Sequence, residues 1–212
     1  MSKNEKKEQI KNVAKNVLLR KGIFKTRVED ITKEMNIAKG SFYTYYKSKD
    51  ILLEDLVNDL LEKVVVENKN IEEKISSLEE GLRQFISNRL IIKSQYLVSQ
   101  LILVNLSRNL EYLGSGIREK LLMLELLNKK TLKNIIKKYC DIDYNEDELE
   151  KITYFIMGGI KSYRVEKLFY KNMEEFFISS EEEFREKIKS IDIEKDINWM
   201  VMMSLKLLTG GK

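Results

Sequence analysis

Residues 22–52 read GIFKTRVEDITKEMNIAKGSFYTYYKSKDIL, a stretch in which two short helical segments flank a tight turn. Thr26 followed by Glu29 forms a capping box, which predicts the start of the first segment. Asn36 tolerates a left-handed backbone and predicts the bend that ends this segment. A further short helix is predicted over about 39–45. Two short helices joined by a tight turn within a basic segment are typical of a helix-turn-helix.

Longer helices are predicted on both sides of this stretch. Apolar residues recur at helical spacing from Ile10 to Leu18, and Gly22 ends that helix. Ser48 caps a helix that reaches about Lys69. The remaining periodicity predicts helices from Asn70 through Ile86, over about Gln95–Arg108 and Gly116–Tyr139, from Asn145 to about Lys171, from Ser180 to about Ile191, and over about Glu194–Leu208. The predicted fold class is all-α, with an amino-terminal three-helix unit and a larger helical body.

Composition agrees with long helices and removes several classes of chemistry. The 212 residues include no proline and only 9 glycines, fewer than the turns of a β-rich chain require. Histidine is absent and Cys140 is the single cysteine, which excludes Ser-His-Asp and Cys-His catalysis, His-containing zinc sites and disulfides within the chain. We therefore expect no catalytic residue, no metal and no cofactor.

Neither a membrane span nor an export signal is predicted. The longest stretch without a charge, from Ser94 to Ser107, has 14 residues, whereas a membrane helix needs roughly 20. The first 20 residues are charged and lack the apolar core of a signal peptide. We expect a cytoplasmic protein with no membrane partner.

Charge is distributed unevenly along the chain. Residues 1–50 contain 13 Lys and Arg residues against 6 Asp and Glu residues, a net charge of +7, whereas residues 51–212 carry a net charge of −3. A basic segment of this kind favours contact with a polyanion. Scattered surface lysines in a lysine-rich chain would produce the same imbalance, so charge alone leaves both interpretations open.

The register of residues 22–31 and 37–52 resembles the amino-terminal domain of the TetR family of bacterial transcriptional regulators. The resemblance implies a helix-turn-helix DNA-binding domain over 5–65, with the motif at about 27–46. It also implies that residues 66–212 form a helical domain for effector binding and dimerisation. The implied activity is sequence-specific binding of double-stranded DNA by a homodimeric repressor that an effector releases.

The resemblance also implies roles for individual residues. Hydroxyl and ammonium groups that would contact phosphates belong to Thr26, Ser41, Tyr43 and Lys49. Tyr45 matches a position that often touches the DNA backbone. Lys39 and Gly40 stand where the family reads base edges, since lysine donates to guanine and glycine permits close approach. Arg27 and Glu29 would face the same groove.

Two predicted helices of the body, over about 145–171 and about 194–208, are apolar on nearly every side. A helix of this kind must be covered on every side. Gly158 and Gly159 lie within one of them, and each costs about 1 kcal/mol relative to alanine in a helix interior. Packing of another helix against their bare backbone would explain this cost. The expected dimer interface comprises Ile156, Gly158, Gly159, Ile160, Tyr163, Ile197, Trp199, Met200, Val201 and Met203.

Such an interface would be a four-helix bundle between two copies of the chain, as in TetR-like proteins. A two-fold dimer of this kind implies a palindromic operator. The alternative is that both helices are central helices of a monomeric core.

The other helices are expected to enclose a small, largely apolar effector, as in similar regulators. Candidate lining residues are Phe85, Ile86, Arg89, Tyr96, Leu97, Leu101, Met123, Leu127, Tyr154 and Met157. Arg89 extends an apolar stripe, and burial of its guanidinium would require an anionic partner, which an acidic ligand could supply. We favour the alternative, in which the stem packs on the core and the head lies in water.

Two other classes of function remain open. A helical adaptor that binds another protein through its apolar surfaces would make DNA binding secondary. An enzyme would depend on Lys, Asp, Glu, Tyr or Cys140, and no spacing of these residues indicates a paired site.

Overall fold

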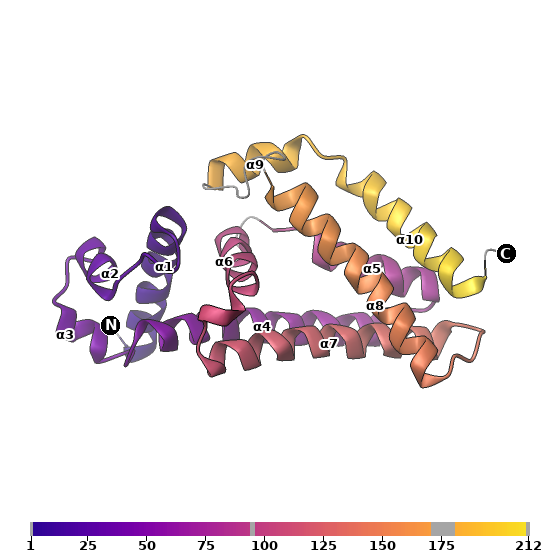
Figure 1. Cartoon of the computed structure of the whole chain (residues 1–212), viewed down its shortest axis with the longest axis horizontal. Coiled ribbons are helices and arrows are strands. Elements are labelled where there is room, and N and C mark those ends of the chain that lie inside the picture. Colours follow the sequence, from indigo (N-terminus) through magenta and orange to yellow (C-terminus); the bar gives the residue numbers. More distant parts are fainter. Residues whose placement is uncertain (1, 94–95, 171–180, 211–212) are drawn as a thin grey trace. The chain divides into compact units, whose positions relative to one another are not determined.

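The computed structural model describes residues 2–93, 96–170 and 181–210, and within these ranges it contains helices and no strand (Figure 1). The all-α prediction is confirmed for these residues. Among them, no helix combines the length and the apolar character needed to cross a bilayer.

The chain divides into two compact units. The first unit contains α1 (Lys3–Lys21), α2 (Val28–Glu34), α3 (Lys39–Tyr43), the first part of α4 (Lys49–Lys74), α6 (Leu97–Ser107), the 3-10 helix η2 (Leu110–Tyr112) and the first part of α7 (Ser115–Tyr139). The second unit contains the remainder of α4 and α7 with α5 (Leu78–Leu90), α8 (Glu146–Tyr163), the π-helix η3 (Arg164–Phe169), α9 (Glu181–Lys189) and α10 (Ile193–Thr209).

The observed division differs from the predicted one, which has a single boundary after residue 65. The first unit ends its amino-terminal part at Leu61 and also includes the later segment 93–122. The physical reason is that α1 packs against α6. A contact between segments so distant in sequence leaves no local signal.

Several predicted helix ends are confirmed by their caps. Asn145 and Glu148 form the expected capping box at the start of α8. Gly210 adopts the left-handed conformation that ends α10, and α7 begins and ends within one residue of its predicted limits.

The predicted helix boundary near Lys69 is wrong. Instead of ending near Lys69, α4 continues through Asn70 to Lys74, and α5 begins after Ser77, whose hydroxyl accepts from the Glu80 N–H at 3.2 Å. Ile71 and Ile75 are buried and extend the apolar face of α4 past Asn70, so packing outweighs the local capping signal. Three further predicted limits, at Gln95, Lys171 and Ser180, lie outside the described residues.

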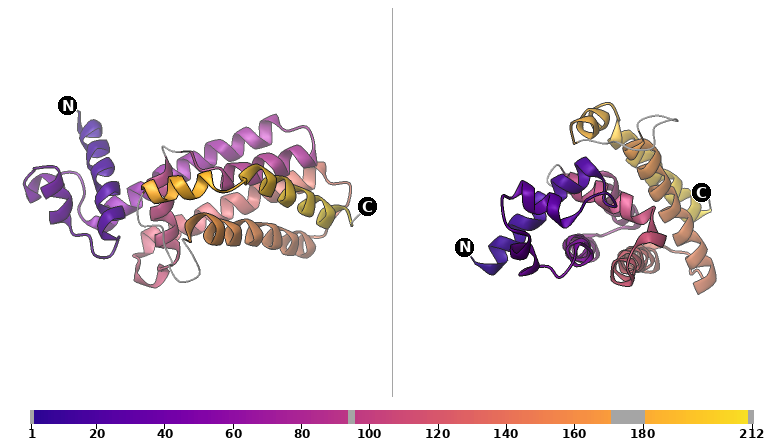
Figure 2. Two further views of the ribbon diagram at one scale, coloured as in Figure 1. Left: turned by 90° about the horizontal axis from the view of Figure 1, so that it is seen from above. Right: turned by 60° about the vertical axis from the view of Figure 1, so that its left-hand side comes forward.

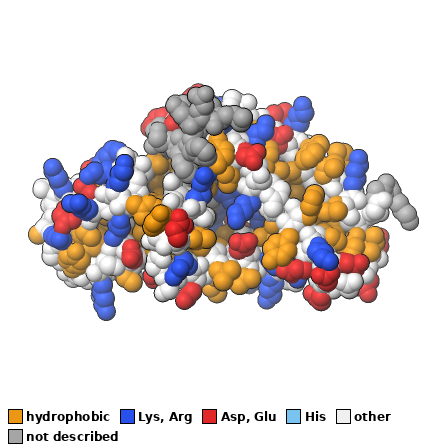
Figure 3. Space-filling model, viewed as in Figure 1, with side chains coloured by type: hydrophobic (Ala, Val, Ile, Leu, Met, Phe, Trp, Pro, Cys, Tyr) orange, Lys and Arg blue, Asp and Glu red, His pale blue; other side chains and the backbone are white. Residues whose placement is uncertain are grey.

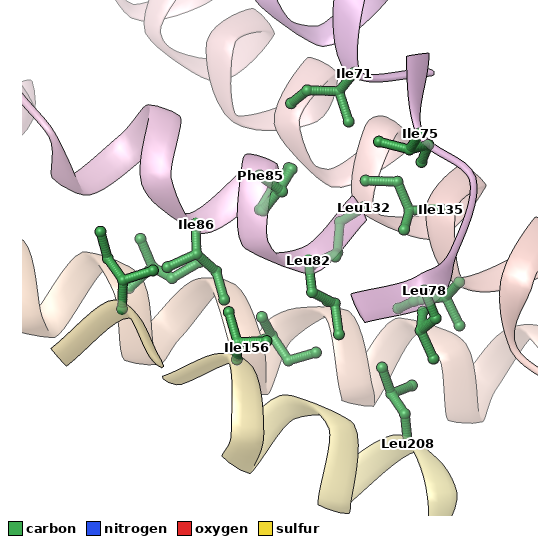
Figure 4. Close-up of a cluster of buried hydrophobic side chains, with 14 of the residues drawn as sticks. Ile71, Ile75, Leu78, Leu82, Phe85, Ile86, Leu132, Ile135, Ile156 and Leu208 are labelled. Carbon is green, nitrogen blue, oxygen red and sulfur yellow. The ribbon is translucent and has the colours of Figure 1, made fainter. Parts of the chain in front are cut away.

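The core of the second unit forms around α5. Leu82, Phe85 and Ile86 are completely buried there and meet side chains from α4, α7, α8 and α10 (Figure 4). The two views of Figures 1 and 2 agree in placing α8 and α10 side by side. Each of these helices buries one face in this core.

At Gly81 the backbone of α5 lies close to neighbouring side chains. A Cβ at this residue would lie 2.6 Å from Cγ2 of Ile135 and 3.0 Å from Cδ1 of Ile75. Both neighbours are themselves buried, so they have little space into which to move. The contact therefore leaves room for the hydrogen of glycine at this position but not for a methyl group.

We predict that Gly81→Ala lowers the free energy of unfolding by about 1–3 kcal/mol because of overpacking. This loss would outweigh the gain of about 1 kcal/mol in helix propensity. Urea unfolding followed by circular dichroism measures the change. Asn88→Ala, on the exposed face of α5, is the control and should alter stability by less than about 0.5 kcal/mol. Unchanged stability of the Gly81 variant would contradict the packing argument.

Candidate nucleic-acid interface

The turn between α2 and α3 has the conformation predicted from Asn36. This residue has a φ of 53°, in the left-handed region, and the Ile37 N–H donates to the Thr32 carbonyl at 3.0 Å. The α3 helix that follows has only five residues. A helix this short is not stable on its own, so its position depends on the side chains that anchor it.

Phe42 and Tyr46 are those anchors. Both side chains are buried, and their ring centroids lie 5.8 Å apart. The Tyr46 hydroxyl donates to Oδ2 of Asp55 on α4 at 2.7 Å. Burial and this carboxylate raise the pKa of the Tyr46 hydroxyl above its ordinary value. The inward side of α3 is therefore fixed, and its other side is left at the surface.

Two expected phosphate contacts have other roles in this structure. Thr26 is only 1% exposed, and its hydroxyl donates to the Gly22 carbonyl at 2.8 Å. The Lys49 ammonium donates to the carbonyls of Ile23 and Thr26 at 2.8 and 2.9 Å. Burial lowers the pKa of Lys49. The Thr26 hydroxyl is thus enclosed within the protein, and the Lys49 ammonium uses two of its three N–H donors on these carbonyls.

The start of α2 also differs from the predicted capping box. Arg27 occupies the cap position, and its N–H donates to Oδ2 of Asp30 at 2.9 Å. Thr26 and Glu29, the predicted pair of the capping box, each precede by one residue the positions that form the cap. The threonine hydroxyl points back to Gly22 because that carbonyl lies at the open end of α1.

The other expected DNA-contacting residues lie at the surface. Six of them are exposed: Arg27, Glu29, Lys39, Gly40, Ser41 and Tyr43. Tyr45 is half-buried, and Tyr43 is 45% exposed with its ring edge-on to Phe42. A Cβ at Gly40 would meet no atom within 4 Å, so the first turn of α3 presents an open surface.

Lys39 and Glu29 form an ion pair across the turn. The pair raises the pKa of the Lys39 ammonium and lowers the pKa of the Glu29 carboxyl. Both side chains remain more than half exposed, which makes such a pair weak in water. Lys39 can therefore exchange Glu29 for another acceptor at little cost.

Four exposed cations near the motif form no ion pair in the described part of the chain: Lys25, Arg27, Lys33 and Lys47. In contrast, the acidic residues Asp30 and Glu34 are paired with Lys21 and Arg20. Figure 3 shows Lys and Arg side chains projecting over α1–α3. The sequence analysis named only Arg27 of these four, although the others stand in the same basic stretch.

The expected dimer residues separate into two groups. Ile156, Ile160, Ile197 and Val201 are buried within the second unit, because each faces its core; this part of the prediction is wrong. Tyr163 and Met200 are half-buried, and the Tyr163 hydroxyl donates to Asp196 at 2.5 Å. Four are exposed: Gly158, Gly159, Trp199 and Met203.

Exposed apolar side chains gather on the outer faces of α8 and α10, as Figure 3 shows. Phe155 is 73% exposed and Trp199 57% exposed. Tyr154 on α8 and Met202 on α10 are also exposed, and a Cβ at Gly158 or Gly159 would meet no atom within 4 Å. The sequence analysis missed Phe155 and Met202, because it did not resolve which side of each helix faces the core.

The expected effector-lining residues do not form a single group. Leu97 and Leu101 are buried and Tyr96 is half-buried in the first unit, whereas Phe85 and Ile86 are buried in the second. Leu127 and Met157 are half-buried. Met123 and Tyr154 are exposed on the outer sides of α7 and α8, so neither lines an enclosed space in this structure.

The environment of Arg89 differs from the one we favoured, in which the head of the side chain lies in water. Its guanidinium does not extend into water but donates to the Phe85 carbonyl and to the side-chain oxygens of Asn68 and Asn128. Among the described residues, no group of Cys, Asp and Glu side chains is arranged to hold a metal ion.

We predict that Lys49→Met destabilises the protein by about 1–3 kcal/mol, since two largely enclosed carbonyls lose their donor. Lys47→Met is the control, because Lys47 is exposed and forms no bond in the described structure. Thermal and urea unfolding of both variants provide the comparison. Equal stabilities for the two variants would contradict the anchoring role of Lys49.

Residues 10–56 match the family model described as bacterial regulatory proteins of the tetR family. Two relatives from Bacillus subtilis (strain 168), both described as uncharacterized HTH-type transcriptional regulators, are YerO, 36% identical over 73 residues, and YuxN, 37% identical over 70 residues. These matches cover 34% and 33% of this chain and 25% and 24% of the relatives. The chain thus matches about a quarter of the length of these curated relatives.

Solved structures extend the likeness of the fold to most of the chain. A TetR transcription regulator from Haloarcula marismortui ATCC 43049 superposes with a TM-score of 0.65 at 17% identity, over 88% of this chain and 94% of that protein. The fatty acid degradation regulator FadR from Bacillus halodurans gives a TM-score of 0.64 at 16% identity, over 94% of both chains. The segment that contains α2 and α3 therefore matches the tetR family of bacterial regulatory proteins, and most of the chain shares the fold of these solved structures.

Proposed function

We propose that this chain is a non-enzymatic, sequence-specific DNA-binding regulator of transcription that acts as a homodimeric repressor. Its first unit would carry α3 into the major groove of double-stranded DNA. Its second unit would bind a small effector that releases the DNA. Such a protein would act in the cytoplasm, where its DNA is found.

The observation that carries the DNA-binding proposal is the exposed outer side of α3. Lys39, Gly40 and Ser41 form its first turn, and no side chain covers Gly40. A short helix anchored on one side and open on the other fits the major groove. The unpaired cations Lys25, Lys33 and Lys47 would add contacts to phosphates in place of Thr26 and Lys49.

The exposed apolar faces of α8 and α10 support a homodimer. Large apolar side chains exposed in such numbers are uncommon on a monomer and mark an interaction site. Two copies packed through these faces would form a four-helix bundle. The two α3 helices would then read half-sites one helical turn of DNA apart, or a multiple of it, which requires a palindromic operator.

Release by an effector requires that the effector bind one conformation of the dimer better than another. Both α4 and α7 contribute residues to each unit. A conformational change in the second unit would therefore be transmitted to the first through these two continuous helices. A helical adaptor for another protein is the second candidate, since the faces of α8 and α10 would also suit a different partner.

We predict that the purified chain selects a two-fold symmetric consensus from a random DNA pool. Affinity for this DNA should fall by about three to five orders of magnitude between 50 and 200 mM salt, if six to ten phosphate contacts are made. Fluorescence anisotropy with labelled duplexes measures both properties. Binding without sequence preference, or without salt dependence, would be contrary to the proposal.

Variants of the same protein separate the roles within α3. Lys39→Ala should weaken binding and also reduce the preference for the consensus, since lysine at this position donates to base edges. Tyr43→Ala should weaken all sequences alike, as expected of a contact to the DNA backbone. An equal loss of preference in both variants would contradict these assignments.

We predict that Phe155→Glu converts a dimer into a monomer, because a buried unpaired carboxylate is costly in an apolar interface. Light scattering after size-exclusion chromatography measures the mass at micromolar concentration. Leu122→Glu on α7 is the control, since Leu122 is 58% exposed and lies on neither α8 nor α10. A monomeric native chain, or a dimeric Phe155 variant, would favour the adaptor.

A further inference from the structure

Arg89 on α5 is surrounded by neutral groups drawn from three helices of the second unit. Nη1 donates to the Phe85 carbonyl at 2.7 Å, and Nη2 donates to Oδ1 of Asn68 at 3.0 Å and of Asn128 at 2.5 Å. The guanidinium carbon lies 3.3 Å from the centroid of the Phe85 ring. The charged group is therefore stacked and held in place, but no neighbour here neutralises it.

Among the described residues, no carboxylate forms an ion pair with Arg89. In the described structure its Nε is buried without a hydrogen-bond acceptor. Glu67 on α4 attracts the charge, but this carboxylate already pairs with Lys63 at 3.5 Å. Burial of an unpaired guanidinium is costly, and a neutral side chain of similar size would avoid the cost.

A second arginine lies close enough to act on the charge of Arg89. Arg164, at the start of the π-helix η3, repels the charge of Arg89. Burial and this repulsion lower the pKa of Arg89 to about 9, and burial lowers the pKa of Arg164 to about 10. π-helical turns recur at functional sites. An anion placed here would relieve both the desolvation and the repulsion.

The surroundings of Arg89 are not sealed. Arg89, Leu127, Asn128 and Arg164 are each half-buried, so every one of them keeps part of its surface accessible to solvent. The Nε of Arg89 is nevertheless enclosed. Partly accessible residues therefore lie around an enclosed guanidinium, which stacks on the completely buried Phe85.

We propose that Arg89 binds the carboxylate of an organic acid with an apolar tail, and that such an acid is the effector of the second unit. The assignment rests on the proposed function, in which this unit binds an effector. A carboxylate is planar and accepts two parallel hydrogen bonds from a guanidinium. It would use Nε together with one Nη group and take the place of the Asn128 amide oxygen. The tail would pack on the partly exposed side chain of Leu127.

The test compares acids with their neutral isosteres on the full-length chain at pH 7.5. The probes are butanoate, octanoate and benzoate, each measured against its primary amide by calorimetry and by the shift in melting temperature. At least one acid should bind, and its amide should bind at least about tenfold more weakly, because only the acid forms charge-assisted bonds. Equal binding of acid and amide would overturn the proposal.

Matched variants on α5 identify the anchor. Arg89→Gln should weaken the binding acid at least about tenfold. Arg83→Gln removes the same charge from the same helix, where Arg83 bonds to Asn198 and Glu79, and should leave the affinity within about twofold. Retained binding in the Arg89 variant would overturn the assignment.

Asn128→Asp keeps the proposal testable where the Arg89 variant fails to fold or none of the probe acids binds. It places a carboxylate at the 2.5 Å contact with Nη2 and so supplies the missing anion from within the chain. The ligand-free variant should melt at a higher temperature than the native chain, and the acid should no longer bind. A lower melting temperature, or undiminished binding of the acid, would overturn the proposal.

Failure of this inference is distinguishable from failure of the proposed function. Arg89-dependent binding of an acid by a chain that binds no DNA would overturn the regulatory function while leaving the anion site in place. Salt-dependent, sequence-specific DNA binding by a chain that discriminates no acid from its amide would overturn only the inference. An acid that binds through Arg89 and weakens binding to the selected DNA would support both.

Discussion

The contact between the Lys49 ammonium and the carbonyls of Ile23 and Thr26 is the interaction on which the helix-turn-helix depends. It ties the loop before α2 to the first residue of α4. Between these two points lies α3, which is too short to be stable by itself. With Phe42 and Tyr46 buried beneath it, α3 is held on one side by the core and is free on the other. The open surface at Gly40 is a consequence of this arrangement.

Each unit contains cations that lack a carboxylate partner among the described residues, but their surroundings differ. In the first, Asp30 and Glu34 are paired with basic neighbours at the surface, which leaves other exposed cations near the motif without a partner. Their charges are fully hydrated and cost little. In the second, the guanidinium of Arg89 is largely enclosed, and its hydrogen bonds go only to neutral oxygens. The first pattern suits a polyanion that approaches from outside, and the second suits one anion of defined shape.

Local sequence signals predicted the helices and most of their ends, because caps and apolar periodicity act over a few residues. Asn36 at the turn, the capping box at Asn145 and the glycine end of α10 are examples. The same signals were poor guides to exposure. In α8, apolar residues occur on nearly every side, so their spacing did not distinguish the buried Ile156 from the exposed Phe155.

The sequence by itself determined the all-α class, the position of the helix-turn-helix and the basic character of its segment, since these follow from propensity, spacing and counting. Only the tertiary structure decided which polar groups are available to a partner. Thr26 and Lys49 look like surface donors in the chain, yet Thr26 donates to the Gly22 carbonyl and Lys49 to the carbonyl of Ile23, 26 residues away. Arg89 looks like a side chain that reaches water, yet α4 and α7 enclose its head. Burial and hydrogen bonding are set by segments far apart in sequence, and no local pattern records which segments meet.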